Sequence, residues 1–189
     1  MPFEFHELEL PGLKLVTPKL FPDRRGMFGE SYKSADFRAA GIAAEFMQDN
    51  VSVSVKNVIR GLHYQKADAA QAKLVCCLEG RIFDVAVDIR KGSPTYGKWA
   101  GRVLDGLDWQ MLFVPEGFAH GFSVLSEKAL VSYKVNRGYS PGHSRGICWK
   151  DPALCIDWRL DGPPVVSDQD GALPVLAACD NDFVHGRGV

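Results

Sequence analysis

Short runs of alternating apolar and polar residues, separated by glycine and proline, constrain the fold of this chain more than any other feature. The run VSVSV (51–55) places Val51, Val53 and Val55 on one face of an extended strand. The run 81–90 alternates in the same way, with Phe83, Val85, Val87 and Ile89 on one face and Ile82, Asp84, Ala86 and Asp88 on the other. Similar runs follow at 73–78, 110–115, 121–125 and 129–135. Strands of this length and spacing predict an all-β antiparallel sandwich or barrel.

Helical signals are few. The stretch SADFRAAGI (34–42) predicts one helix, with Ser34 as its N-cap and Gly41 as its stop. The chain has 189 residues, a length that suits one globular domain spanning 1–189. We expect residues 160–189 to form an irregular C-terminal segment with short helical turns.

Composition excludes several classes of partner. The net charge is −1, from 22 basic and 23 acidic residues, so no overall field favours nucleic acid or an anionic membrane. No apolar run approaches the roughly 20 residues of a membrane helix. The start, MPFEFHELEL, is acidic and does not resemble a secretory signal. The five cysteines include no CxxC pair, which indicates reduced thiols and a cytoplasmic protein.

Polar residues that interrupt apolar strand faces are the candidate site residues. They are His63, Lys73, Asp84, His120 and Tyr133. Each alone is commonly structural: a strand histidine or tyrosine is often a hydrogen-bonded core residue, and a strand lysine usually reaches water. One face of each strand in a closed barrel points to the lumen. Together these residues would form a polar pocket with a base, a cation, an acid and a phenol.

Arg60 and His63, in IRGLHYQ (59–65), are separated by an odd number of positions. A regular strand would therefore direct them to opposite faces. Gly61 lies between them, and a glycine inside a strand often marks a β-bulge, which would realign the two side chains. We therefore expect a bulge at Gly61 and a site shaped around it.

The stretch PEGFAH (115–120) matches PxGxxH, the second half-motif of the cupins. In the first half-motif, cupins carry a His-x-His pair and a Glu that bind a metal together with the later histidine. The corresponding stretch here is HYQ, which leaves only His63 and His120 as candidate ligands. Two histidines make a poor transition-metal site. The resemblance implies a cupin (jelly-roll) barrel with few short helices, no metal and no cofactor.

A more extensive resemblance is to the dTDP-4-dehydrorhamnose 3,5-epimerase family. It is carried, in order and spacing, by FPDRRGMFGESY (21–32), FMQDNVSVS (46–54), VIRGLHYQ (58–65), QAKLV (71–75), GRIFDVAVDIRKGSPTYGKW (80–99), VPEGFAHGFSVLSE (114–127), YKVNRGYSP (133–141) and WKDPALCIDW (149–158). Members are metal-free homodimers that invert C3 and C5 of a nucleotide-linked 4-keto-6-deoxyhexose. The product feeds dTDP-L-rhamnose synthesis for cell-surface polysaccharide. The resemblance implies the same substrate class and a homodimer for this chain.

The resemblance also implies catalytic roles. His63 would be the base that removes a proton α to the ketone, and Asp170, in SDQD, would orient it. Lys73 would stabilise the enolate oxygen, and Asp84 would hold Lys73 in place. Tyr133 would return a proton from the opposite face of the sugar.

Further contacts would hold the nucleotide. Arg25 and Arg60 are candidates for the pyrophosphate, because a guanidinium matches phosphate oxygens. Other matches to family contacts are Gln48, Asp49 and Asn50 with the nucleotide, Tyr139 stacking on thymine, His120 on the sugar side and Glu30 near the base. The arm within residues 1–50 would make dimer contacts, so that Arg25 and Glu30 would serve the partner's pocket. Two positions depart from the family pattern: Ser144 stands where Glu is frequent, and Gln169 where Lys is frequent.

Three alternatives remain at this point. The chain could be a mono-epimerase acting at C3 or C5 alone, with the same catalytic residues. It could be a metal-dependent cupin that uses His63 and His120. It could also be a sugar-binding cupin without activity, although binding alone requires no base and acid on opposite faces.

Overall fold

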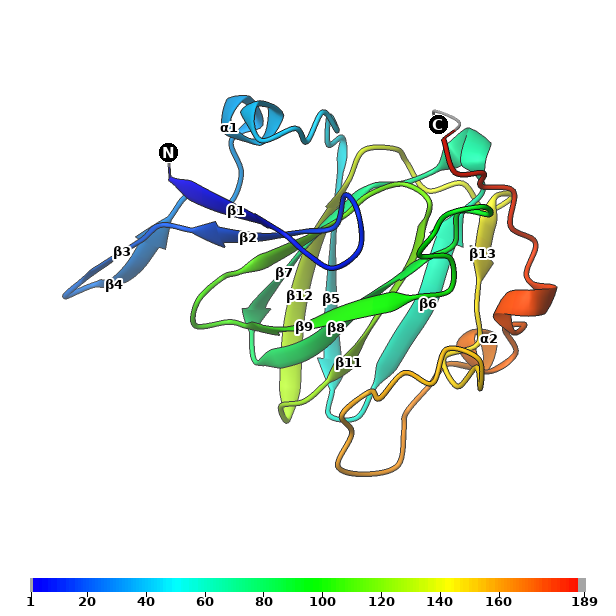
Figure 1. Ribbon diagram of the computed structural model, residues 1–189. Helices are drawn as coiled ribbons and strands as arrows, with labels where there is room; N and C mark the ends of the chain where they lie inside the picture. Colours follow the sequence, from blue (N-terminus) through cyan, green and yellow to red (C-terminus); the bar gives the residue numbers. More distant parts are fainter. Residues whose placement is uncertain (1, 187–189) are drawn as a thin grey trace.

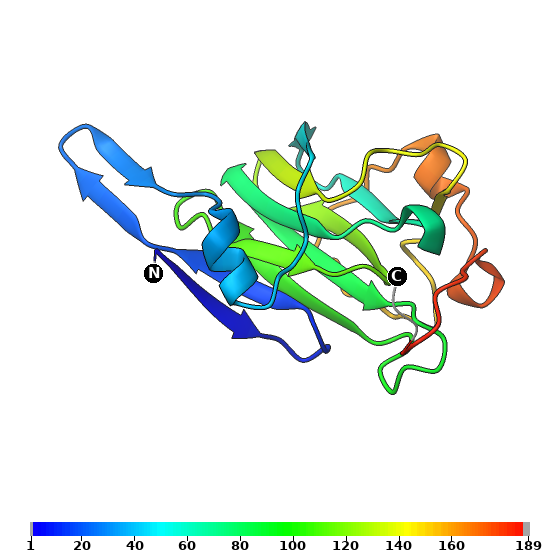
Figure 2. The same ribbon diagram turned by 90° about the horizontal axis from the view of Figure 1, so that it is seen from above.

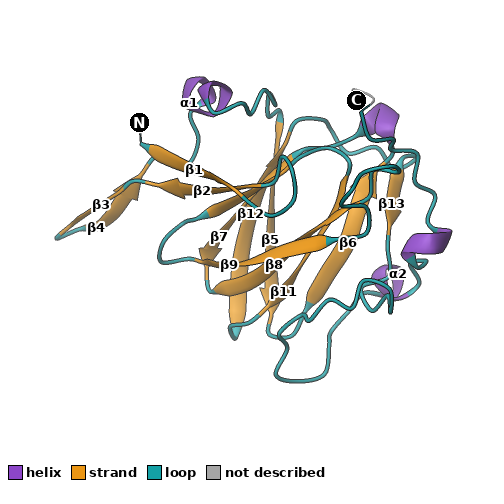
Figure 3. Cartoon of the chain, in the orientation of Figure 1, coloured by secondary structure: helices purple, strands orange, loops and turns teal. Residues whose placement is uncertain are grey.

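The computed structural model describes residues 2–186 and consists mainly of two antiparallel sheets that face each other (Figures 1 and 3). One sheet has six strands in the order β1 (Phe3–Glu7), β2 (Lys14–Pro18), β10 (Met111–Val114), β7 (Lys73–Glu79), β12 (Lys128–Val135) and β5 (Gln48–Val55). The other has five, in the order β13 (Ser144–Gly146), β6 (Ile59–Gln65), β11 (Phe118–Val124), β8 (Arg81–Asp88) and β9 (Trp99–Asp105). The all-β prediction is confirmed.

The alternation predicted for 81–90 is present in β8, and both of its faces are buried. Ile82 and Ala86 belong to the core between the sheets, where they join residues of β7, β10 and β12. Phe83 and Val85 belong to a second cluster on the outer face, which includes Trp158 of the C-terminal segment. The irregular end of the chain therefore covers a sheet face that would otherwise expose large apolar side chains.

The valine face of β5 has a different environment. Val51, Val53 and Val55 share one face, as predicted, but they are 65%, 58% and 60% exposed. The intervening Ser54 is buried. The strand thus presents its apolar side outward, which is the reverse of the usual arrangement in a monomeric sheet.

A two-stranded hairpin, β3 (Leu20–Asp23) with β4 (Gly26–Gly29), projects away from the two main sheets (Figures 1 and 2). The helix expected over 34–42 follows as α1 (Ser34–Ala39), which is shorter than predicted. Its N-cap is Lys33 and not Ser34, because the helix already includes Ser34 in its first turn. Gly41, with φ of +80°, ends it as predicted, because glycine adopts this left-handed conformation at little cost.

The C-terminal segment runs beside β13 and β6 (Figure 1). Its regular elements within the described residues are two short turns of helix, α2 (Asp168–Gly171) and η2 (Leu176–Ala178), and a further turn, η1 (Ala67–Ala69), follows β6. No helix in residues 2–186 is long and apolar enough to cross a membrane.

Candidate active site

The strand β6 is irregular at the glycine singled out in the sequence. Its pairing with β11 shifts register between His63, which lies opposite His120, and Arg60, which lies opposite Phe122. The three-residue interval from His63 to Arg60 on β6 therefore pairs with a two-residue interval on β11, as in a β-bulge. Arg60 and His63 consequently line the same cavity, so the expected bulge is confirmed.

Close packing explains why the residue at the bulge is glycine. The φ of Gly61 is +119°, which side chains rarely allow. A Cβ there would also lie 2.6 Å from the Cα of Gly121 and 2.7 Å from the carbonyl oxygen of His120. The backbone of β11 thus occupies the space that a side chain at position 61 would need.

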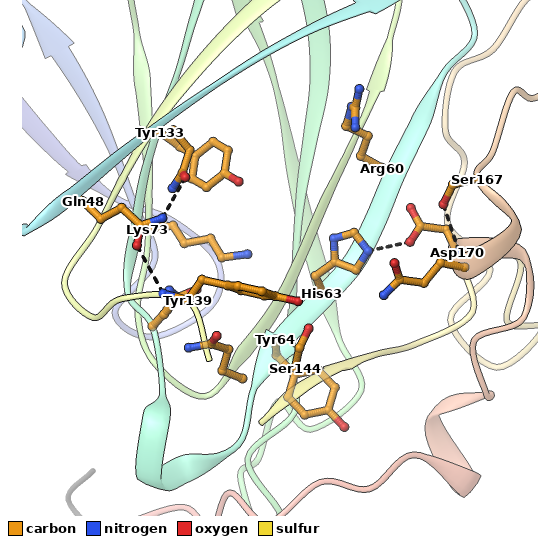
Figure 4. Close-up of a pocket in the computed structure, with 14 residues that line it drawn as sticks. Gln48, Arg60, His63, Tyr64, Lys73, Tyr133, Tyr139, Ser144, Ser167 and Asp170 are labelled. Carbon is orange, nitrogen blue, oxygen red and sulfur yellow. Dashed lines mark hydrogen bonds and ion pairs between the residues drawn. The ribbon is translucent and has the colours of Figure 1, made fainter. Parts of the chain in front are cut away.

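His63 forms a pair with Asp170 of α2 (Figure 4). The ring Nε2 lies 2.6 Å from Oδ1, and the backbone N–H of Gly61 donates to Oδ2 at 3.1 Å. Burial alone would raise the pKa of Asp170, but these hydrogen bonds hold it below its ordinary value. An ionised Asp170 requires Nε2 to be the donor, which leaves Nδ1 as the unprotonated nitrogen able to accept a proton.

The first turn of α2 positions the Asp170 carboxylate at the cavity. Ser167 is the N-cap of α2, and its Oγ accepts a hydrogen bond from the backbone N–H of Asp170 at 3.1 Å. The sequence SDQD is of the kind that begins a helix, with a capping serine followed three residues later by an acid. The cap fixes the backbone from which the Asp170 side chain reaches His63.

Lys73 of β7 and Tyr133 of β12 lie on the facing sheet, so they approach the cavity from the wall opposite His63 (Figure 4). Burial lowers the pKa of Lys73 to about 8, although the charge of Asp84 opposes this shift. Burial raises the pKa of Tyr133, with the charge of Arg60 opposing. A cation and a protonated phenol therefore face an imidazole across one space.

His120 and Asp84 form a second pair at the deep end of the site. The ring Nε2 lies 2.7 Å from Oδ1 of Asp84, whose side chain is 0% exposed. Burial lowers the pKa of His120, and Asp84 only partly offsets it, so the ring is neutral near pH 7. The hydrogen bond of Asp84 goes to His120, and its influence on Lys73 is electrostatic.

Apart from Asp84, these residues line a cavity of about 580 Å³ and a smaller hollow of about 140 Å³. His63, Lys73, Arg60 and Tyr133 border both spaces, and His120 borders the hollow. Tyr139, Gln48 and Asn50 lie at the wider space. The arrangement has a narrow end lined by titratable side chains and a wide polar end, so it fits a small reacting group attached to a larger polar one.

Comparison with known proteins identifies the family. The model of the dTDP-4-dehydrorhamnose 3,5-epimerase family matches residues 7–178. The chain belongs to this family. A 3,5-epimerase of Shigella flexneri is 50% identical over 163 residues, which cover 86% of this chain and 90% of the relative.

Solved structures agree with this family membership. A 3,5-epimerase from Legionella pneumophila Philadelphia 1, in complex with dTDP-4-keto-L-rhamnose, superposes with a TM-score of 0.90 and 43% identity, covering 93% of this chain and 94% of that one. A 3′-monoepimerase from Streptomyces bikiniensis, in complex with dTDP-quinovose, gives a TM-score of 0.87 and 34% identity, covering 91% and 87%. The cupin-type barrel is therefore that of the epimerase family.

Four candidate residues of the epimerase-family resemblance lie outside this cavity. Asp84 is one of them, because its side chain is fully buried behind His120. Arg25 is exposed in the β3–β4 hairpin and pairs with Asp23 at 2.6 Å, and Glu30 follows the hairpin. Asp49 faces away from its neighbours Gln48 and Asn50, because side chains alternate along β5, and it pairs with Lys134 at 2.9 Å. The two positions that depart from the family pattern, Ser144 and Gln169, both line the cavity.

Sequence reasoning missed several lining residues. They are Ser52, Tyr64, Gln65, Gln71, Phe122 and Ser167. The capping pattern in SDQD could have identified Ser167, and the inward face of VSVSV could have identified Ser52. The glutamines carry no such signal, because their role depends on a loop distant in sequence.

The surroundings of the two histidines bear on the alternative that the chain is a metal-dependent cupin. His63 Nε2 and His120 Nε2 are each engaged by a carboxylate, Asp170 and Asp84 respectively. Among residues 2–186, no three His, Cys, Asp or Glu side chains gather in a way that could hold a metal ion. The side chains present fit acid–base chemistry better than metal coordination.

Proposed function

We propose that this epimerase-family member inverts C3 and C5 of dTDP-4-dehydro-6-deoxy-D-glucose to give dTDP-4-dehydro-L-rhamnose. The observation that carries the proposal is the placement of His63, oriented by Asp170, on one wall of the cavity and of Lys73 and Tyr133 on the other. Epimerisation requires a base and an acid on opposite faces of the reacting carbon, and the two sheets supply them.

In each half of the proposed reaction, Nδ1 of His63 removes the proton from the carbon beside the 4-keto group. The electron pair of the broken C–H bond moves to the ketone oxygen, giving an enolate that the Lys73 ammonium stabilises. The Tyr133 hydroxyl then donates a proton to the same carbon from the opposite face, and the electron pair returns from the oxygen to form the new C–H bond. Solvent then takes the extra proton from His63 and returns a proton to the Tyr133 phenolate, which resets both groups.

The wider end of the cavity would bind the nucleotide. Arg60 lies between the two ends, where its guanidinium suits the pyrophosphate. The exposed ring of Tyr139 would stack on the base, and Gln48 and Asn50 would contact it (Figure 4). His120, at the hollow, would contact the sugar.

The active form would be a homodimer. The exposed valine face of β5 supports this proposal, because 58–65% exposure of neighbouring apolar side chains is unusual on a free surface. The projecting hairpin supports it too, since Phe21 and Phe28 are 46% and 67% exposed there. Arg25 and Glu30, which lie outside this chain's cavity, would then serve the pocket of the partner.

The enzyme would act in the cytoplasm, in dTDP-L-rhamnose synthesis for cell-surface polysaccharide.

Incubation with dTDP-4-dehydro-6-deoxy-D-glucose in D₂O tests the reaction. We expect deuterium at both C3 and C5, detected by mass and by NMR. Label at one carbon only would contradict double epimerisation and favour a mono-epimerase. Absence of label at both carbons would overturn the epimerase proposal for this substrate.

A further inference from the structure

The loop that carries Tyr139 connects β12 to β13 and is held by three glutamine side chains from different parts of the chain. We call residues 136–143 the Tyr139 loop. Gln71 Nε2 donates to the carbonyl of Arg137 at 2.6 Å, and Gln48 Oε1 accepts from the N–H of Tyr139 at 3.2 Å. Gln65 binds the loop twice. Four consecutive residues, 137–140, are therefore each held through the backbone by a glutamine.

Gln65 is the central member of this set. Its Oε1 accepts from the N–H of Ser140 at 2.6 Å, and its Nε2 donates to the carbonyls of Gly138 at 3.3 Å and Ala69 at 2.7 Å. The side chain is 4% exposed, so these bonds form away from water, where a lost partner is costly. Through one amide, the end of β6 is tied to both flanks of Tyr139.

The exposure of Tyr139 contrasts with the burial of Gln65. The Tyr139 residue is 61% exposed, and its ring has no aromatic partner among the described residues. A side chain so open would sample several positions if its backbone were free. The glutamines remove that freedom from the backbone while leaving the face of the ring available to a ligand (Figure 4).

We infer that Gln65 is a positioning residue for the nucleotide: it fixes the Tyr139 loop so that the Tyr139 ring is already in place to stack on a flat base. Ordering the loop before binding removes an entropic cost from the binding step. Gln65 therefore sets nucleotide affinity and has little influence on proton transfer. This inference rests on the proposed stacking role of Tyr139 and extends it to a residue whose side chain bonds the backbone of the Tyr139 loop.

The test compares Gln65→Leu with Tyr139→Ala and with the double variant, using dTDP as the probe in calorimetric titration. Loss of the Gln65 bonds to the loop is expected to raise the Kd for dTDP about tenfold. The KM for the nucleotide sugar should rise similarly, while kcat stays close to that of the wild type. In the Tyr139→Ala background, the Gln65 substitution should have no further effect on Kd, because the ring it positions is gone.

Two controls keep the test interpretable. Gln110→Leu removes a glutamine hydrogen bond of 3.2 Å to Thr17, outside the cavity, and should leave the Kd for dTDP unchanged. Gln65→Glu retains the shape and the acceptor for Ser140 N–H, so it replaces the Leu variant if that variant fails to fold; it too should weaken dTDP binding, because it loses both N–H donors.

The outcomes separate the inference from the proposed function. If Tyr139→Ala weakens dTDP binding and the Gln65 variants do not, or if the two effects multiply, the positioning role is overturned and the stacking role stands. If Tyr139→Ala leaves dTDP binding unchanged, both the stacking role and the inference are overturned. A fall in kcat with an unchanged KM would also contradict the inference.

Discussion

The structure holds two histidine–aspartate pairs whose histidines lie on neighbouring strands, and the surroundings of the two pairs differ. His63 on β6 and His120 on β11 are cross-strand partners, and each ring bonds a carboxylate at 2.6 or 2.7 Å. The side chain of His63 is 41% exposed and borders both parts of the cavity, whereas that of His120 is 7% exposed. Similar hydrogen-bond distances thus accompany unequal exposure of the two rings.

Burial, more than pairing with a carboxylate, separates the roles of the two histidines. Burial keeps His120 neutral by lowering its pKa, and Asp84 beside it supplies negative charge close to Lys73. Asp170 sits on a short helix at the surface of the barrel, where it can hold His63 without closing the cavity. One pair is suited to proton transfer, and the other to shaping the electrostatics of the site.

The largest effect should come from His63→Asn. Removal of the base is expected to lower kcat for deuterium exchange at both carbons by about 10²–10⁴-fold, the usual contribution of general base catalysis. His120→Asn should mainly lower the melting temperature and raise KM, because it leaves Asp84 buried without its partner. Equal losses of kcat in the two variants would contradict the assignment of His63, and not His120, as the base.

Asp170→Asn should follow in size. An amide there no longer requires Nε2 of His63 to be the donor, so the ring can adopt the tautomer that is useless as a base. We expect kcat to fall by about 100-fold with little change in dTDP binding. Measured exchange rates with D₂O, together with calorimetric titration of dTDP, separate the two quantities. An unchanged kcat would show that His63 acts without its carboxylate.

The pH dependence of kcat/KM tests the electrostatic role of Asp84, the buried partner of His120. Lys73 must be protonated to stabilise an enolate, and its pKa is about 8, so kcat/KM should fall as pH rises through about 8. Asp84 raises that pKa, and Asp84→Asn should therefore move the alkaline limb to lower pH. Asp161→Asn, which removes an exposed carboxylate paired with Lys56, should leave the limb in place. A limb that stays near pH 8 in Asp84→Asn would contradict the electrostatic role.

The smallest effect should come from Ser167→Ala. Loss of an N-cap costs about 1 kcal/mol, and here it loosens the short helix that presents Asp170. A several-fold fall in kcat should accompany a small fall in melting temperature. Ser126→Ala removes a comparable bond to the N–H of Arg81, at 2.8 Å in an exposed turn, and should affect stability alone. Equal kcat values for the two variants would show that the cap does not position the dyad.

Local sequence patterns predicted the strands well because alternation is a property of neighbouring residues. The two faces of β8 and the shared face of Val51, Val53 and Val55 could be assigned in this way. The same patterns could not show that the valines are exposed, since periodicity gives the face and not the environment. The misplaced helix cap at Ser34 has a related cause: helix boundaries depend on a few hydrogen bonds that sequence alone leaves open.

By itself, the sequence determined the alternation of polar and apolar faces along the strands and the glycine at position 61, and through resemblance it predicted the candidate site residues. The tertiary structure decided which of them meet. His63 and Asp170 are 107 positions apart, and His120 and Asp84 are 36 apart, so no local pattern links them. Sheet topology brings such residues together, because cross-strand pairing and loop closure act over distances in sequence that periodicity does not describe.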